Sequence, residues 1–72
     1  MELSQCNAEL SNYSHLIGQI LTHKISKMNI IVLELKCELN IDNDYFVNFY
    51  VKHQLTGSIE FLDLDFIKKY YL

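Results

Sequence analysis

The sequence predicts an α+β domain in which an N-terminal amphipathic helix packs on a three-stranded antiparallel β-meander, followed by a short C-terminal helix. Two observations support this prediction. Between residues 3 and 25, apolar residues recur at spacings of three and four, as on one side of a helix. Between residues 31 and 53, beginning with Ile31 and Leu33, they alternate with other residues, as on the core-facing side of a strand. We expect the 72 residues to form a single domain.

The N-terminal helix is expected from residue 3 to about residue 25. The side opposite its apolar residues is polar but nearly uncharged, and on it Ser4, Ser11 and Gly18 recur every seven residues. Such small side chains would let a second helix approach closely, so they form a candidate dimer face. The alternative is an ordinary solvated face, although a glycine inside a helix costs about 1 kcal/mol relative to alanine.

The central hairpin is expected between residues 30 and 55. A loop of residues 42–44 would pair Ile41 with Tyr45 and Glu34 with Lys52, and it would keep the apolar sets of both strands on one face. A loop shorter by one residue would send the second set to the wrong side. Ile30 and Val32 would then lie on the opposite face, where they extend the candidate dimer face.

A third strand is expected from residue 59 to about residue 64, after a turn at residues 56–58. In the preferred register Leu62 pairs with Val51 and faces the N-terminal helix, whereas Ile59 and Phe61 lie on the other face. The alternative register keeps Ile59 and Phe61 inside, with a bulge near Leu62. Asp63 or Asp65 would cap the C-terminal helix, expected over residues 66–72.

No residue pattern predicts catalysis or metal binding. Cys37 and His53 share the predicted core face but lie roughly 13 Å apart along it, too far for a nucleophile and its base. Ser11 and His15 lie one helical turn apart, but no carboxylate is placed to orient the histidine. The histidines show no metal-ligand spacing, and the acidic turn lacks the glycine and the distal glutamate of a calcium loop. We expect no enzymatic activity, no cofactor and no metal.

The composition and charge of the chain limit the classes of partner that it is expected to bind. The net charge is −3 and arginine is absent, so no concentrated basic patch predicts direct binding to nucleic acid. Two cysteines make no disulfide framework and indicate a reduced, cytoplasmic protein. No apolar run is long enough to span a membrane. The abundance of isoleucine, asparagine, lysine and tyrosine fits an AT-rich genome, such as that of a virus or mobile element.

The remaining functional signal is a surface on the central hairpin. Acidic and aromatic residues alternate there as the candidate partner-binding set: Glu34, Glu38, Asp42, Asp44, Phe46 and Tyr50. The leading hypothesis is a small acidic protein-binding module that occludes a basic surface of a larger protein. Immunity proteins, nuclease inhibitors and phage anti-defence proteins, including anti-CRISPRs, act in that general way. One alternative function is a homodimeric structural or assembly protein, and another is an enzyme whose site is made from two subunits. The alternative to an exposed partner surface is that the C-terminal helix covers the second sheet face.

Overall fold

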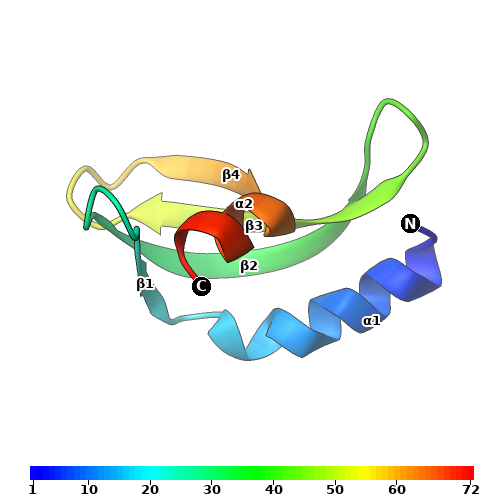
Figure 1. Cartoon of the computed structure of the whole chain (residues 1–72), viewed down its shortest axis with the longest axis horizontal. Coiled ribbons are helices and arrows are strands. Elements are labelled where there is room, and N and C mark those ends of the chain that lie inside the picture. Colours follow the sequence, from blue (N-terminus) through cyan, green and yellow to red (C-terminus); the bar gives the residue numbers. More distant parts are fainter.

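The computed structural model describes all 72 residues. It contains, in chain order, α1 (Leu3–Tyr13), a 3-10 turn η1 (Ser14–Leu16), β1 (Ile20–Thr22), β2 (Asn29–Leu39), β3 (Tyr45–His53), β4 (Ile59–Asp63) and α2 (Leu64–Tyr70). The strands form one antiparallel sheet in the order β1-β2-β3-β4 (Figure 1). The predicted α+β class is confirmed, as is its order of helix, sheet and helix, but the sheet has four strands instead of three.

One hydrophobic core joins both helices to the same face of the sheet. Cys6 of α1 and Ile67 of α2 belong to the same buried cluster as Val32, Phe49 and Leu62 of the strands. All of them except Leu62 are fully buried, and Leu62 is nearly so. The opposite face of the sheet has no helix over it. The alternative in which the C-terminal helix covers that face is therefore wrong.

The predicted N-terminal helix is too long. It ends at Tyr13, and the segment that follows turns back to add β1 to the edge of β2, pairing Leu21 with Ile30. Gly18 lies at the change of direction with a φ of +83°, a left-handed conformation that glycine adopts without a steric penalty. Strand pairing with β2 thus overrides the helical periodicity. Ser4 and Ser11 remain on α1, but Gly18 lies outside it, so the three residues do not form a continuous helical stripe.

From Glu34 to His53 the central hairpin keeps the predicted faces but shifts the pairing. Leu39 pairs with Tyr45 and Cys37 with Val47, so the loop runs from residue 40 to residue 44. The Asn40 side chain sets this longer loop, because its Oδ1 accepts hydrogen bonds from the backbone amides of Asp42 and Asp44 at 2.9 and 3.0 Å. A shift by two residues leaves every side chain on its original face.

A β-bulge at Leu33 changes the alternation within β2. Val32 pairs with Val51, but the next pair is Glu34 with Tyr50, which leaves Leu33 as an extra residue. Ile30 and Val32 are consequently fully buried, so they cannot contribute to a surface dimer face. The predicted core positions of Ile31 and Leu33 are wrong as well, since Ile31 is half-buried and Leu33 exposed. Because residues 30–33 are all apolar, the sequence pattern does not show where the alternation between the two faces shifts.

The last strand keeps the preferred faces, but the predicted pair of Leu62 with Val51 is wrong, because the longer loop shifts the register by two residues. Leu62 is buried on the helix side and pairs with Phe49, whereas Phe61 is 63% exposed on the other side. Asp63 caps α2 by accepting a hydrogen bond from the Phe66 amide at 2.8 Å, so the helix begins two residues earlier than expected. At its far end, α2 is fixed by a 2.7 Å hydrogen bond from the Lys24 amide to the Tyr70 carbonyl.

Candidate functional site

The uncovered side of the sheet is the candidate site, and we call it the open face. Its apolar members come from all four strands and alternate with the buried residues of the core. They are Ile20, Ile31, Leu33, Phe46, Tyr50, Ile59 and Phe61. Its polar members are Glu34, Lys36, Glu38, Asn48, Lys52 and Asp63. Ile59 and Phe61 are 54% and 63% exposed, which is unusual for large apolar side chains lying side by side.

The strand register arranges these residues in rows across the sheet. In one row Ile20 lies opposite Ile31, which lies opposite Lys52, which lies opposite Ile59. In the next row Tyr50 of β3 lies between Glu34 of β2 and Phe61 of β4. Tyr50 and Phe61 are in direct contact, and Ile59 lies on the same side of β4 as Phe61, so these three residues form the patch. Lys52 separates Ile59 from Ile31 and Ile20 in the other row.

The Tyr50 ring is the centre of the patch. It contacts Phe61 edge-on, with the ring centroids 4.7 Å apart and the planes at 62°. Its hydroxyl donates a hydrogen bond to Glu38, and the Lys36 ammonium lies 5.1 Å above the ring centroid. Lys36 also approaches Glu34 at 3.9 Å. These contacts hold the tyrosine in a fixed orientation, so the site is organised before any partner arrives.

The structure brings together only part of the predicted partner-binding set. Glu34, Glu38, Phe46 and Tyr50 lie on the open face, where Phe46 is half-buried opposite Glu38. Asp42 and Asp44 instead occupy the tip of the β2–β3 hairpin, beyond the last paired residues. The predicted surface is therefore two adjoining regions, the aromatic patch on the sheet and an acidic tip.

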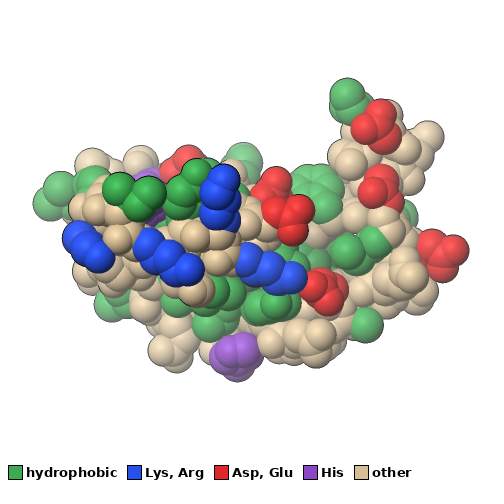
Figure 2. Space-filling model, in the orientation of Figure 1, with side chains coloured by type: hydrophobic (Ala, Val, Ile, Leu, Met, Phe, Trp, Pro, Cys, Tyr) green, Lys and Arg blue, Asp and Glu red, His purple; other side chains and the backbone are tan.

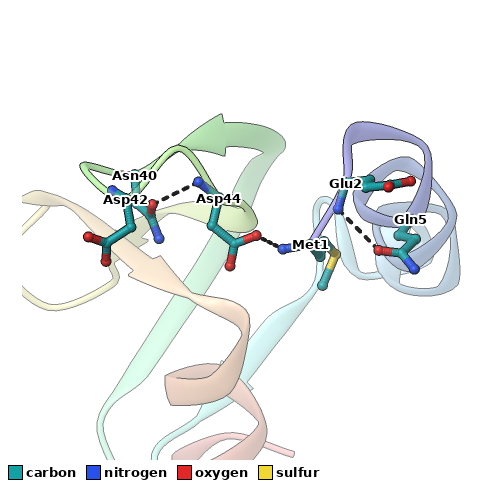
Figure 3. Close-up of polar contacts among 6 residues, drawn as sticks. All are labelled: Met1, Glu2, Gln5, Asn40, Asp42 and Asp44. Carbon is teal, nitrogen blue, oxygen red and sulfur yellow. Dashed lines mark hydrogen bonds and ion pairs between the residues drawn. The ribbon is translucent and has the colours of Figure 1, made fainter.

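The hairpin tip is a folded loop. Figure 3 shows the Asp44 carboxylate directed at the amino group of Met1, with which it forms an ion pair. Tyr45 donates its amide to the Met1 carbonyl at 3.0 Å, which brings the start of the chain against the hairpin. Asn43 takes the left-handed φ of +57° that closes the loop. The Asp42 carboxylate makes none of these contacts and faces outward, available to a cation on a partner (Figure 3).

Charge is distributed unevenly along the molecule. Lysine side chains gather over the α2 side, whereas acidic side chains gather toward the hairpin tip (Figure 2). Lys24 and Lys27 lie in the β1–β2 turn, which is bonded to the end of α2. At the other end, Asp44, Asp63 and Asp65 line one surface depression. The acidic end adjoins the open face because Asp63 belongs to both.

Sequence reasoning missed several members of the patch. Ile20 was assigned to a helix, and Ile31 and Leu33 to the core. Gly18 is a signal that could have placed Ile20 correctly, because a glycine permits a left-handed turn and lowers the expectation that a helix continues through it. No sequence signal shows which of residues 30–33 face the core and which face the open side.

Other chemistry of the chain lies apart from this surface. Cys6 is buried and Cys37 half-buried, and neither is in a disulfide. The structure holds no cluster of three or more histidine, cysteine, aspartate or glutamate side chains with the geometry of a metal site. None of its helices has the length and apolar character needed to cross a membrane.

Comparison of the chain with protein-family models, with curated proteins and with solved structures gives no significant match.

Proposed function

We propose that this protein is a protein-binding module without catalytic activity, and that the open face of its sheet is the surface that binds. The supporting observation is the exposed pair of Phe61 and Ile59 beside the fixed ring of Tyr50. An apolar surface with ordered aromatic residues matches the composition of protein-binding hot spots, where buried aromatic side chains contribute most of the affinity.

The charges around the patch indicate the character of the partner. Around the aromatic residues the acids Glu34, Glu38 and Asp63 outnumber Lys36 and Lys52. The outward-facing carboxylate of Asp42 extends the acidic region at the hairpin tip. A partner with an apolar groove bordered by lysine or arginine side chains would complement this arrangement. Occlusion of such a surface, as an inhibitor would achieve, requires only that the module stay bound.

The experiment compares two alanine variants of matched character. Phe61→Ala removes an exposed aromatic residue from the open face, and Leu55→Ala removes an apolar residue that is 81% exposed in the β3–β4 loop. Because neither residue is in the core, both variants should keep the wild-type circular dichroism spectrum and unfold within about 1 kcal/mol of it.

Quantitative affinity capture then separates the two variants. Loss of a hot-spot aromatic costs at least about 2 kcal/mol, so Phe61→Ala should bind the captured partner about 30-fold more weakly. Leu55→Ala should bind as the wild type does. Equal binding by the two variants would show that the open face is not the interface.

The acidic tip has a separate test. Asp42→Lys should weaken binding at low ionic strength, mainly through slower association, and the difference should diminish at high salt. An Asp42→Lys variant that associates at the wild-type rate at every salt concentration would remove the basic-surface part of the proposal.

A further inference from the structure

The outer edge of β4 is an unpaired strand edge. β4 is the last strand of the sheet, and no other element runs along its outer side (Figure 1). The His53 amide donates to the Ser58 carbonyl at 2.8 Å, which fixes the hydrogen-bonding phase between β3 and the chain entering β4. Since backbone groups alternate in direction, Glu60 and Leu62 bond to β3, whereas Ile59, Phe61 and Asp63 direct their amides outward.

This edge lacks the usual features that prevent strand pairing. Natural edge strands are blunted by lysine, proline, a bulge or very short length. β4 contains no lysine or proline, and its register with β3 has no shift. Its only charges are the acids Glu60 and Asp63, of which Glu60 lies on the helix side of the sheet. The other edge strand, β1, has only three residues and is correspondingly less able to pair. β4 is the edge of this sheet that is suited to receive another strand.

The sequence of β4 is complementary to itself in one antiparallel register. A two-fold axis at Phe61 would place Phe61 opposite its copy, Ile59 opposite Asp63, and Glu60 opposite Leu62. No acid then faces an acid. An axis at Asp63 would oppose two carboxylates, and an axis at Glu60 or Leu62 would align backbone groups that already bond to β3. The axis at Phe61 also uses the full length of the strand.

The charge distribution favours the same arrangement. β4 begins beside the β3–β4 loop, where Leu55 and Lys27 line one depression, and ends at Asp63 beside Asp44 and Asp65. Antiparallel pairing reverses one copy relative to the other. The acidic end of each copy is then brought alongside the lysine-bearing end of its partner, which is the complementary orientation.

We propose that two copies of this chain pair antiparallel through their β4 edges, with the two-fold axis at Phe61. Such an axis is perpendicular to the sheet, so it joins the two sheets into one and keeps both open faces on the same side. The dimer would present a doubled apolar surface, with the helices of both copies on the other side. The proposal rests on strand geometry and holds whether or not the open face binds a different protein.

The first test is amide hydrogen exchange of the unmodified protein across a wide concentration range, together with solution mass from light scattering. As the mass rises to that of a dimer, the Phe61 and Asp63 amides should become protected. The Glu60 and Leu62 amides should be protected at every concentration, because β3 holds them, and they serve as an internal control. A protein that stays monomeric at the highest concentration, or a dimer with an unprotected Phe61 amide, overturns the proposal.

The second test locates the two-fold axis by placing charged side chains at residue 61 and measuring dimer formation. Phe61→Lys and Phe61→Glu should each weaken the dimer at least about tenfold, because like charges would face each other and the ring pair would be lost. Mixing the two variants should restore a dimer as a heterodimer. A mixture that stays monomeric places the axis elsewhere or excludes edge pairing.

Ile59 supplies the matched control for register. Opposite Asp63 of the partner, Ile59→Lys should still form a dimer, whereas Ile59→Glu should not. Equal behaviour of these two variants would contradict the register.

The third test uses a synthetic chain with an N-methyl group on Phe61, which keeps the side chain and removes only the outward amide. It should be monomeric, and a dimer that survives must form face to face. These readouts are masses, so they are separate from the partner-capture result.

Discussion

Cys6 shows how burial tunes a single side chain in this small core. It is fully buried between α1 and the sheet. Burial, with a smaller contribution from the neighbouring Cys37 thiol, raises the pKa of Cys6 to about 12 from its usual 9.0. The folded state therefore favours the neutral thiol, and ionisation of Cys6 opposes folding.

This shift predicts a loss of stability at alkaline pH. Because the folded pKa is raised, the stabilisation is fully present below pH 9.0, and it is lost as the pH rises from there toward about 12. Urea unfolding between pH 7 and 11 should give a free energy that falls more steeply for the wild type than for Cys6→Ala. The alanine variant is less stable throughout but carries no thiol at this position. Parallel slopes for the two proteins would contradict the prediction.

The residues of the open face differ in how far the sequence could place them. Phe61 and Tyr50 were assigned to the correct face because strict alternation fixes the side of a regular strand. Ile30 and Val32 were assigned to the wrong face because a bulge at the next residue, Leu33, shifts the alternation.

At the scale of elements, local signals placed α2 and the hairpins but not the end of α1. The apolar spacing of three and four continues past Tyr13, so periodicity alone extended the helix. Residues 20–22 instead gain strand pairing with β2, a contact between distant parts of the sheet that local periodicity does not contain. Both hairpin loops are also longer than predicted. Side-chain hydrogen bonds, such as those that Asn40 accepts, stabilise the longer loops, and the alternation of apolar residues does not reveal them.

The cap of α2 gives a prediction for a whole element. α2 has seven residues, too few to be stable alone, so its start depends on Asp63. Asp63→Ala should lower the free energy of unfolding by about 1 kcal/mol, since the Phe66 amide loses its acceptor. Asp63→Asn should lose much less, because asparagine is an equally good cap. Chemical denaturation of both variants measures the difference, and equal losses would show that the charge matters and the cap does not.

At the scale of the whole molecule, few buried residues support the fold. Eleven of the 72 residues are buried, with Phe49 the largest of those that are fully enclosed. A core of this size leaves little reserve stability, which is common for chains of this length. The exposed apolar residues of the open face, such as Ile59 and Phe61, therefore add little to the stability of the monomer.

Two phenylalanines on adjacent strands test whether the core residues stabilise the monomer and the open-face residues do not. Phe49→Ala should cost about 3–5 kcal/mol and leave the chain largely unfolded at room temperature. Phe61→Ala removes the same side chain from an exposed position and should cost less than about 1 kcal/mol. Thermal unfolding followed by circular dichroism distinguishes them. If Phe61→Ala also unfolds the chain, the open face is part of the core and the proposed binding surface is wrong.

The bulge at Leu33 has a consequence for changes in chain length. Deleting a residue from a strand normally inverts all side chains on one side of the deletion, and most such deletions abolish folding. Deleting Leu33 would instead join Val32 directly to Glu34 and leave a regular strand in which Val32 and Leu35 still face the core. Natural variants one residue shorter at this position are therefore compatible with the same fold, and an alignment gap there would be no sign of a different one.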